Sequence, residues 1–490
     1  MQLTASDIYT YYRPSTCELR VHLRAAGVQE AEPGVFEKLL RELGIRHETK
    51  HLSIFAKYVD ISTEDPKDRL EATQRAVASG ASVVYQAHLM ATAEIDGQGC
   101  QIFGSPDFLI QEENGYIIRD AKISRRINDK DHPEIILQLE LYGWLFEQSF
   151  GQSPRRLEVF SGSGEIVEID YSGGTAALRI MEKILRIQQM SSPQYCPVGW
   201  SKCNGCLFFD HCWTEAEQYS DVAIIVGVDQ GLAIALHQEG INTVDDLLAN
   251  FDENTLSKYK RPWGEGLRRV GKNAQKILQM ARSLNSGQEM LLGMADIPDH
   301  SNYVMFDLEG LPPQLDETDR VYLWGMQVCG ENPGKYLSAL AGFGEEGDKE
   351  GWIEFLNQAG VIFCQHGDIR FVHWATYEKT NMRRYLDRYG DVDGIGQRVF
   401  NNLLDLLPIT RGSIALPVPS YSLKVVEKHI GYERKLDEYG GEWAIAKYIE
   451  AVETEDEKLR QEIMNKILEY NHEDLEATWA VLCWLKSKNV

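Results

Sequence analysis

The segment GSPDFLIQEENGYIIRDAK, residues 104–122, constrains the fold more than any other part of this sequence. Two apolar runs flank Asn114-Gly115, a dipeptide that strongly favours a two-residue β-turn, so the segment predicts a β-hairpin. With that dipeptide as the loop, Asp107 lies directly opposite Lys122. Strand side chains alternate between faces, so Asp120 is expected on the same face as Lys122. The hairpin therefore predicts two carboxylates and one ammonium on one side of a sheet.

Three charges on one strand face are costly to bury unless they pair or bind a metal ion. One acid opposite one lysine is an ordinary cross-strand pair, but a second aspartate calls for another cation. Two carboxylates that hold Mg²⁺ or Mn²⁺, with a lysine beside the attacking water, are typical of phosphodiester cleavage. The alternative is an exposed hairpin face that carries these charges by chance.

Two further patterns accompany the hairpin. Gln138 and Tyr142 are four residues apart in QLELY, and so lie on one side of a predicted helix. GIRHE supplies His47 and Glu48 in a helical context, with His51 and His88 as rivals of His47 for a metal ligand. Each pattern alone also fits a surface pair or a core histidine.

The order of these motifs is specific. Gly44-x-x-His47, Pro106-Asp107, Asp120-x-Lys122 and Gln138-x3-Tyr142 occur as they do in the RecB-type branch of the PD-(D/E)XK nucleases, which this region resembles. The resemblance implies a restriction-endonuclease-like core, and it implies that His47 and the two aspartates bind a divalent metal. It also implies that Lys122 acts at the nucleophile and that Gln138 and Tyr142 contact DNA.

Four of the nine cysteines, Cys196, Cys203, Cys206 and Cys212, lie close together. The last three need a fourth ligand for Zn²⁺ or for a [4Fe-4S] cluster, and either Cys196 or the distant Cys17 could supply it. The chain resembles iron–sulfur members of the RecB-type nucleases, with one cysteine before the nuclease core and three after it. That resemblance implies a structural [4Fe-4S] cluster on Cys17, Cys203, Cys206 and Cys212, with Zn²⁺ as the alternative.

A second acidic pattern lies towards the C-terminus. Asp307 and Glu309 alternate on an apolar strand in MFDLEG, and Tyr470 and Asp474 are one helical turn apart in YNHEDLEATW. Glu378 lies between these two motifs. Ordinary alternation on a half-exposed strand is the simpler explanation of the first pair.

The order of these signals resembles the RNase H-like 3′–5′ exonucleases of the DEDDy type. The resemblance implies that Asp307, Glu309 and Asp474 bind two metal ions and that Tyr470 orients the attacking water. The family's middle Asn-x3-(Phe/Tyr)-Asp appears here as His373-x3-Tyr377-Glu378, so that Glu378 would replace an aspartate ligand. This departure puts the activity of the second centre in question.

The region between these modules, residues 216–292, reads as helical. LAIALHQEGINTVDDL is similar to a helix–hairpin–helix, although a plain helical connector fits this pattern slightly better by itself, and the basic stripe that follows favours DNA contact. A capped helix is expected to begin near Thr243. Residues 258–276 contain seven cations against one acid. This stripe is either a solvated helix face or a DNA contact made by Lys260, Arg261, Arg268 and Arg269.

Length and charge set the remaining bounds. The 490 residues suit an α/β multidomain protein, with expected domains at 1–215 (the nuclease module with its cluster), 216–292 (the connector) and 293–490 (the RNase H-like domain). A net charge of −24 argues against a protein that coats nucleic acid non-specifically. The sequence shows no apolar run of membrane-spanning length and no secretory signal pattern, so we expect a cytoplasmic location and no membrane partner.

The combined expectation is a metal-dependent DNA nuclease that acts on single strands or duplex ends, in repair or recombination. The whole chain looks like the bacterial RecB-like nucleases that carry a C-terminal RNase H-like domain. Because no GxxxxGK[ST] motif is present, a helicase or recombination partner would supply strand separation. The alternatives are an RNA-processing nuclease and a non-catalytic nucleic-acid-binding adaptor with degenerate sites.

Overall fold

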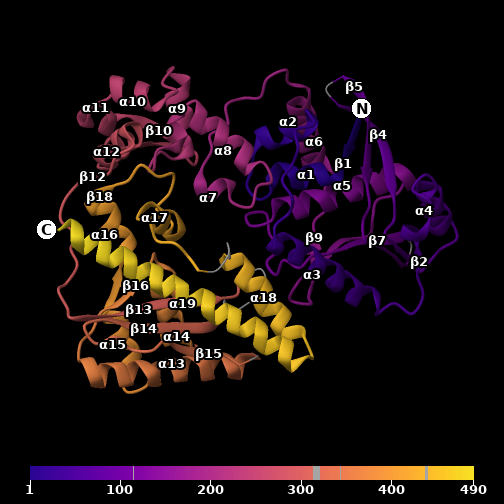
Figure 1. Ribbon diagram of the computed structural model, residues 1–490. Coiled ribbons are helices and arrows are strands. Elements are labelled where there is room, and N and C mark those ends of the chain that lie inside the picture. Colours follow the sequence, from indigo (N-terminus) through magenta and orange to yellow (C-terminus); the bar gives the residue numbers. More distant parts are fainter. Residues whose placement is uncertain (96, 114, 313–319, 343, 436–439, 490) are drawn as a thin grey trace. The chain divides into compact units, whose positions relative to one another are not determined.

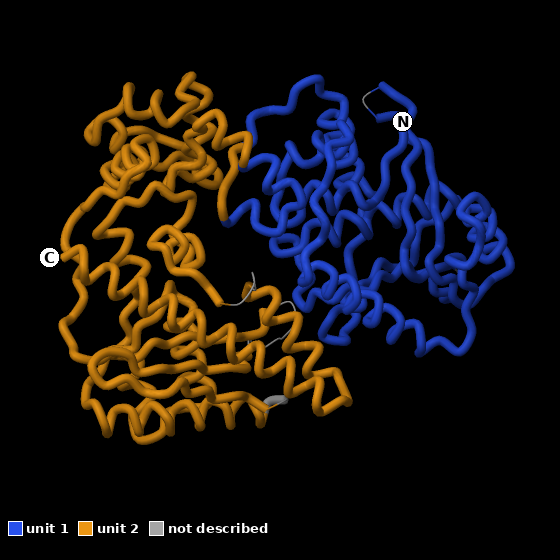
Figure 2. Tube along the Cα trace, in the orientation of Figure 1, with its two compact units in different colours: residues 1–196, 201–213, 313–317 blue, residues 197–200, 214–312, 318–490 orange. Residues whose placement is uncertain are grey.

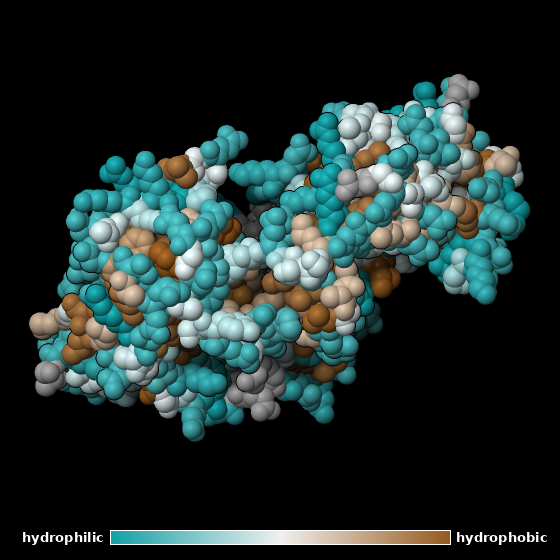
Figure 3. All heavy atoms as spheres, turned by 90° about the horizontal axis from the view of Figure 1, so that it is seen from above, coloured by the Kyte–Doolittle hydropathy of each residue, from teal (hydrophilic) through white to brown (hydrophobic). Residues whose placement is uncertain are grey.

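The computed structural model describes residues 1–490 except 96, 114, 313–319, 343, 436–439 and 490. The described chain forms two compact units (Figure 2). One unit comprises residues 1–196 and 201–213, and the other comprises 197–200, 214–312 and the described part of 318–490. None of the helices in these described ranges is long and apolar enough to span a membrane. Hydrophilic side chains cover most of the face drawn in Figure 3, as the composition leads one to expect.

The first unit combines helices with two sheets (Figure 1). Its helices are α1 (Ala5–Tyr12), α2 (Glu18–Ala25), α3 (Val35–Leu52), η1 (Ile61–Thr63), α4 (Arg69–Ala78), α5 (Pro133–Phe150) and α6 (Thr175–Gln189), while α7 (Trp200–Cys203) and α8 (Phe209–Gln218) each include residues of both units. Its strands are β1 (Gln2–Thr4), β2 (Val59–Asp60), β3 (Val83–Tyr85), β4 (Leu89–Ile95), β5 (Gln98–Gly104), β6 (Phe108–Glu112), β7 (Gly115–Ala121), β8 (Leu157–Phe160) and β9 (Ile166–Ile169). One sheet has the order β1-β5-β4 and the other β2-β3-β6-β7-β8-β9.

The predicted hairpin is present as β6 and β7, but its register differs from the expectation. Glu112 pairs with Gly115 and Phe108 with Arg119, so Asp107 is level with Asp120 rather than with Lys122. The expected loop residue Asn114 lies outside the described residues. A slip of two residues leaves every side chain on its original face, because side chains alternate with period two. The apolar pattern therefore could not distinguish the two registers.

The second unit begins with a connector. It contains η2 (Val222–Ile224), α9 (Gln230–Gln238), α10 (Val244–Asn250), α11 (Glu253–Lys258), β10 (Lys260–Trp263), β11 (Gly266–Arg269), α12 (Asn273–Ser286) and β12 (Met290–Leu291). Helix α10 begins where predicted, because the side chain of Thr243 accepts from the N–H of Asp246 at 3.1 Å. The prediction of a helical basic stripe is wrong, since β10 and β11 form an antiparallel hairpin.

The rest of the second unit is an α/β fold. Its strands are β13 (Asn302–Gly310), β14 (Val321–Gly330), β15 (Leu337–Leu340), β16 (Phe371–His373), β17 (Leu403–Asp405) and β18 (Ile414–Ala415). Its helices are α13 (Gly344–His366), α14 (Tyr377–Tyr389), α15 (Ile395–Asn401), α16 (Leu406–Ser413), α17 (Leu423–His429), α18 (Gly441–Glu453) and α19 (Glu457–Lys488). The main sheet has the order β15-β14-β13-β16-β17, with β13 antiparallel to β14 and parallel to β16.

Strand β13 has two chemically different faces. Val304, Phe306 and Leu308 pack into a core with Trp352 and Phe355 of α13. Side chains alternate along a strand, so Asp307 and Glu309 point to the opposite face, which α19 covers (Figure 1). The sheet thereby carries both acids to the side of the long C-terminal helix.

Candidate functional site

Three carboxylates converge between β13 and α19. One oxygen each of Asp307, Glu309 and Asp474 lies within 4.8 Å of the others. Glu309 and Asp474 are buried, and Asp307 is partly exposed. The structure thus brings together three of the acids that the sequence singled out, two from one strand and one from a helix more than 160 residues away.

Asp307 is held by an asparagine that the sequence reasoning missed. The Nδ2 of Asn471 donates to Oδ2 of Asp307 at 2.7 Å, and the hydroxyl of Tyr336 donates to Oδ1 of Asn471 at 2.8 Å. Gly325 pairs with Asp307, and a Cβ atom there would lie 1.8 Å from Oδ1 of Asn471. The glycine is therefore needed for Asn471 to reach the acid. Asn471 lies three residues before Asp474, so helical periodicity could have placed it on the same face.

Asp474 has a cation of its own. The Nη2 of Arg434 donates to Oδ1 of Asp474 at 2.5 Å, while Nε of Arg434 donates to Oε1 of Glu427 at 2.6 Å. All three side chains are largely buried. Arg434 follows α17 in a loop and belongs to no recognisable motif, so nothing in the sequence pointed to it.

Glu378 lies at the N-terminus of α14 and is buried. Its Oε2 is 3.1 Å from Nδ1 of His373, at the end of β16. Glu378 is not one of the three mutually close ligands, but its charge contributes to raising the pKa of both Asp307 and Glu309. The expected middle acid is therefore next to the cluster, with a histidine as its partner.

The electrostatics of the cluster are unfavourable without a further cation. Burial, followed by the charges of Asp474 and Glu309, raises the pKa of Asp307 well above its ordinary value. Burial also raises the pKa of Asp474, although Arg434 opposes this shift. Burial and the charge of Asp474 raise the pKa of Tyr470, which keeps its hydroxyl protonated and able to donate. Crowded carboxylates of raised pKa are characteristic of functional sites.

A second acidic group lies in the first unit. Nζ of Lys122 is 3.0 Å from Oδ2 of Asp120, and the N–H of Asp107 donates to Oδ1 of Asp120 at 3.0 Å. Oδ2 of Asp107 accepts from the N–H of Ala121 at 2.8 Å. Burial and the neighbouring charge of Asp120 raise the pKa of Asp107 well above its ordinary value. Lys122 and Asp120 are thus paired, and Asp107 lies beside Asp120 despite the shifted register.

Glu48, which follows His47 in GIRHE, adds a further acid beside Asp107. Nε2 of Gln86 donates both to Oε1 of Glu48, at 2.6 Å, and to Oδ1 of Asp107, at 2.9 Å. The neighbouring His47 instead stacks on the ring of Phe160, 4.5 Å between centroids, and its Nε2 is 3.1 Å from the carbonyl oxygen of Phe160. Helix α3 therefore directs Glu48, one residue after the predicted ligand, to the aspartates.

The predicted DNA-contact pair lies on α5. Nε2 of Gln138 donates to the hydroxyl of Tyr142 at 3.0 Å. Tyr142 is buried, and burial together with the charges of Asp120 and Asp107 raises its pKa. Gln138 is half-buried and is the more accessible member of the pair.

Two of the other cysteines lie near the start of α2. The sulfurs of Cys17 and Cys196 are 3.7 Å apart, and Nη1 of Arg20, one turn after Cys17, is 3.9 Å from the sulfur of Cys206. Cys203 ends α7 and Cys212 lies in α8. The sequence-distant Cys17 therefore lies beside Cys196 and in the neighbourhood of Cys206.

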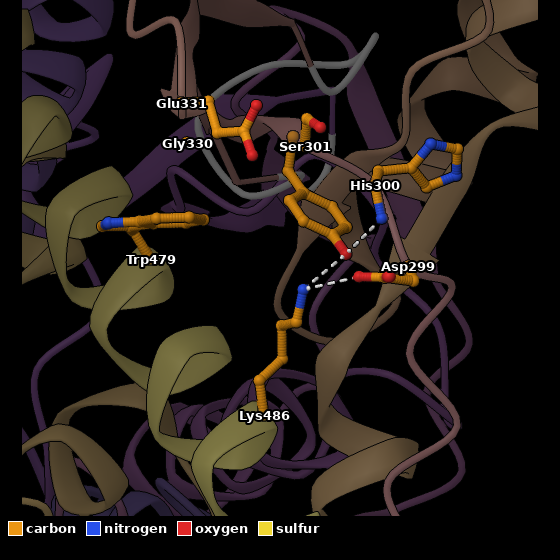
Figure 4. A pocket seen from close by; sticks show the side chains of 8 residues that line it. Asp299, His300, Ser301, Gly330, Glu331, Trp479 and Lys486 are labelled. Carbon is orange, nitrogen blue, oxygen red and sulfur yellow. Dashed lines mark hydrogen bonds and ion pairs between the residues drawn. The ribbon is translucent and has the colours of Figure 1, made fainter.

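A pocket of about 520 Å³ opens elsewhere in the second unit (Figure 4). It is lined by Asp299, His300, Ser301, Tyr303, Gly330, Glu331, Trp479 and Lys486. Nζ of Lys486 contacts Asp299 at 3.2 Å and the hydroxyl of Tyr303 at 3.3 Å, as the dashed lines show. These residues come from the beginning of β13 and the segment before it, from the end of β14 and from the C-terminal part of α19, and none belongs to the acidic cluster.

Residues 304–486 match the sequence model of the RNase_H superfamily, and this part of the chain is an RNase H-like domain. No curated protein matches the chain. Among solved structures, SSO0001 is 18% identical over 36% of this chain and 94% of its own, with a TM-score of 0.20. A candidate exonuclease from Eubacterium rectale is 16% identical over 41% of this chain and 87% of its own, with a TM-score of 0.28.

Proposed function

We propose that this protein is a divalent-metal-dependent nuclease that hydrolyses phosphodiester bonds in DNA, with single strands or duplex ends as substrates. The observation that carries the proposal is the convergence of Asp307, Glu309 and Asp474 within 4.8 Å in a domain of the RNase_H superfamily. Nucleases of this kind work on a phosphate that carboxylate-bound metal ions hold.

The donor set fits Mg²⁺ or Mn²⁺. All three groups offer carboxylate oxygens, the ligands that these hard cations prefer, and their mutual repulsion would be relieved by a cation. When bound, such a cation supplies an activated water and neutralises charge at the phosphate. Asn471 fixes the direction of the Asp307 carboxylate, and the protonated hydroxyl of Tyr470 is available to orient a water. Glu378, held by His373, is the fourth acid of this centre.

The ion pair of Lys122 with Asp120, beside which Asp107 lies, supports a second hydrolytic centre, of the PD-(D/E)XK type, in the first unit. Burial lowers the pKa of Lys122, but the charges of Asp120 and Asp107 outweigh it and raise the pKa overall, so the ammonium is retained. We further propose that Cys17, Cys203, Cys206 and Cys212 hold a structural [4Fe-4S] cluster, with Zn²⁺ as the alternative. The contact of Arg20, one turn after Cys17, with the sulfur of Cys206 supports this proposal.

The test uses the full-length protein with single-stranded DNA, duplex DNA and RNA of one sequence, each labelled at one end, in Mg²⁺ or Mn²⁺. The variants are Asp307→Asn, Lys122→Ala and the double variant. Asp387→Asn and Lys57→Ala repeat the same changes at exposed positions of the same units and serve as controls.

Each single variant should lose one set of cleavage products, and the double variant should lose both. Undiminished cleavage by the double variant would disprove the assignment of the two centres. A wild-type protein that binds but cleaves none of the three substrates would instead identify a nucleic-acid-binding adaptor. Cleavage of RNA alone would identify an RNA-processing enzyme.

A further inference from the structure

The β10–β11 hairpin concentrates positive charge in a way that strand pairing alone disfavours. Arg261 lies directly opposite Arg268, and Lys260 lies opposite Arg269. Like charges opposite each other destabilise an antiparallel pair, so this hairpin is not optimised for its own stability. A bound polyanion would turn the same arrangement into a favourable one.

One of the four cations has a structural role instead. Arg261 is only 7% exposed, and its Nη2 lies 2.5 Å from Oδ2 of Asp229, the N-cap of α9. This ion pair ties the hairpin to α9. Lys260, Arg268 and Arg269 are exposed.

An exposed aromatic side chain lies among these charges. Trp263 is 52% exposed at the tip of the hairpin, opposite Gly266, which has no side chain to cover it. The guanidiniums of Arg261 and Arg268 lie 4.6 Å and 4.8 Å from the centroid of its ring. Cation–π contacts of this kind hold the ring in place while half of its surface remains open.

We propose that this hairpin binds single-stranded nucleic acid, with a base stacked on Trp263 and phosphates contacted by Lys260, Arg268 and Arg269. The inference rests on the proposed function for the class of ligand. An aromatic platform inside a basic surface is the usual way to hold a strand without reading its sequence. Stacking requires an unpaired base, so the hairpin selects single strands over duplex.

The experiment measures binding without cleavage. Fluorescence anisotropy of full-length protein in EDTA is recorded with labelled oligothymidylate, with an abasic strand of the same length and with a duplex. The variants are Trp263→Ala, Trp263→Phe and the double change Arg268→Ala/Arg269→Ala. Tyr219→Ala, which removes another exposed aromatic of the same unit, and Lys466→Ala, which removes an exposed cation, are the controls.

Trp263→Ala should weaken binding of oligothymidylate by between about 5-fold and about 150-fold, leave binding of the abasic strand unchanged and be rescued by Trp263→Phe. The Arg268→Ala/Arg269→Ala variant should bind both the oligothymidylate and the abasic strand more weakly, and its binding should depend less on salt concentration. The proposal would be overturned if Trp263→Ala bound oligothymidylate as tightly as Tyr219→Ala does. It would also be overturned if Trp263→Ala lost as much affinity for the abasic strand as for oligothymidylate, or if the wild type bound duplex more tightly than single strands. Because EDTA prevents metal-dependent hydrolysis, these results stand apart from failure of the nuclease assignment.

Discussion

Asn471 donates its side-chain amide to Asp307 across 2.7 Å and is itself completely buried. A buried partner of a metal ligand fixes the direction of that ligand and tunes its basicity. Asn471→Ala should therefore weaken Mn²⁺ binding or activity at the centre of Asp307, Glu309 and Asp474 by about 10- to 100-fold. Titration calorimetry with Mn²⁺ measures the affinity directly. Asn465→Ala, at an exposed position of the same helix, should leave it unchanged, and equal affinities in both variants would refute this role.

The acidic cluster should make stability depend on pH and on metal. Burial and the neighbouring carboxylates raise the pKa of Asp307 and Glu309 in the folded state, so the folded state binds more protons than the unfolded chain. The stabilisation is full below the unfolded pKa of about 4 and is lost as the pH rises towards the folded pKa. In EDTA, the Tm of Asp307→Asn should therefore rise relative to the Tm of wild type as the pH increases. Each kcal/mol of relieved repulsion corresponds to about 2–4 °C in Tm.

Mn²⁺ should make wild type more stable than Asp307→Asn. The cation stabilises wild type increasingly with pH because it binds the ionised acids, whereas Asp307→Asn should gain little. Thermal unfolding at several pH values, with EDTA or Mn²⁺, gives both comparisons. A difference in Tm between the two proteins that does not change with pH would contradict the assigned repulsion.

The Arg434–Asp474 pair should matter far more than a surface ion pair. Removing one partner of a buried pair typically costs about 3–5 kcal/mol, whereas an exposed pair contributes about 0–1 kcal/mol. Arg434→Gln should thus destabilise the metal-free protein strongly. Arg398→Gln, which breaks an exposed pair with Asp368, should have little effect. Urea unfolding measures both, and similar losses would exclude the special role of Arg434.

Lys122 should be coupled to Asp120. Lys122→Met leaves the 1%-exposed Asp120 without its ammonium and should cost about 1–3 kcal/mol, whereas Lys122→Met/Asp120→Asn should recover part of that loss. The double-mutant cycle, read by urea unfolding, reports the interaction. Additive losses from the two single changes would show that the pair is not coupled.

The choice between Cys17 and Cys196 is open to a direct assay. If the cluster is [4Fe-4S], anaerobically purified protein should be brown and contain iron and sulfide. Cys17→Ser should remove both, while Cys196→Ser should retain them. The reverse outcome would assign Cys196 as the ligand. Colourless protein that contains zinc would show that the cysteines bind Zn²⁺ instead of an iron–sulfur cluster.

Periodicity explains what could be predicted from the sequence and what could not. Alternation placed Asp307 and Glu309 on one face, and helical spacing related Tyr470 to Asp474. The two-residue shift in the hairpin register could not be predicted, because it moves no side chain to the other face of the sheet. The roles of Arg434 and Gln86 could not be predicted because both residues lie outside helices and strands, where side chains follow no regular periodicity. Gln86 even adopts a positive φ of 52°.

The pairing of Met290 and Leu291 with Ala415 and Ile414 joins the connector to the C-terminal fold. Ser283 in α12 strengthens this link by donating to the carbonyl oxygen of Ala415 at 3.1 Å. Gene fusion or truncation at residue 292 would therefore expose an open strand edge and orphan that carbonyl. We therefore expect residues 214–490 to be inherited as one unit, so relatives that contain the acidic centre should also contain the basic hairpin.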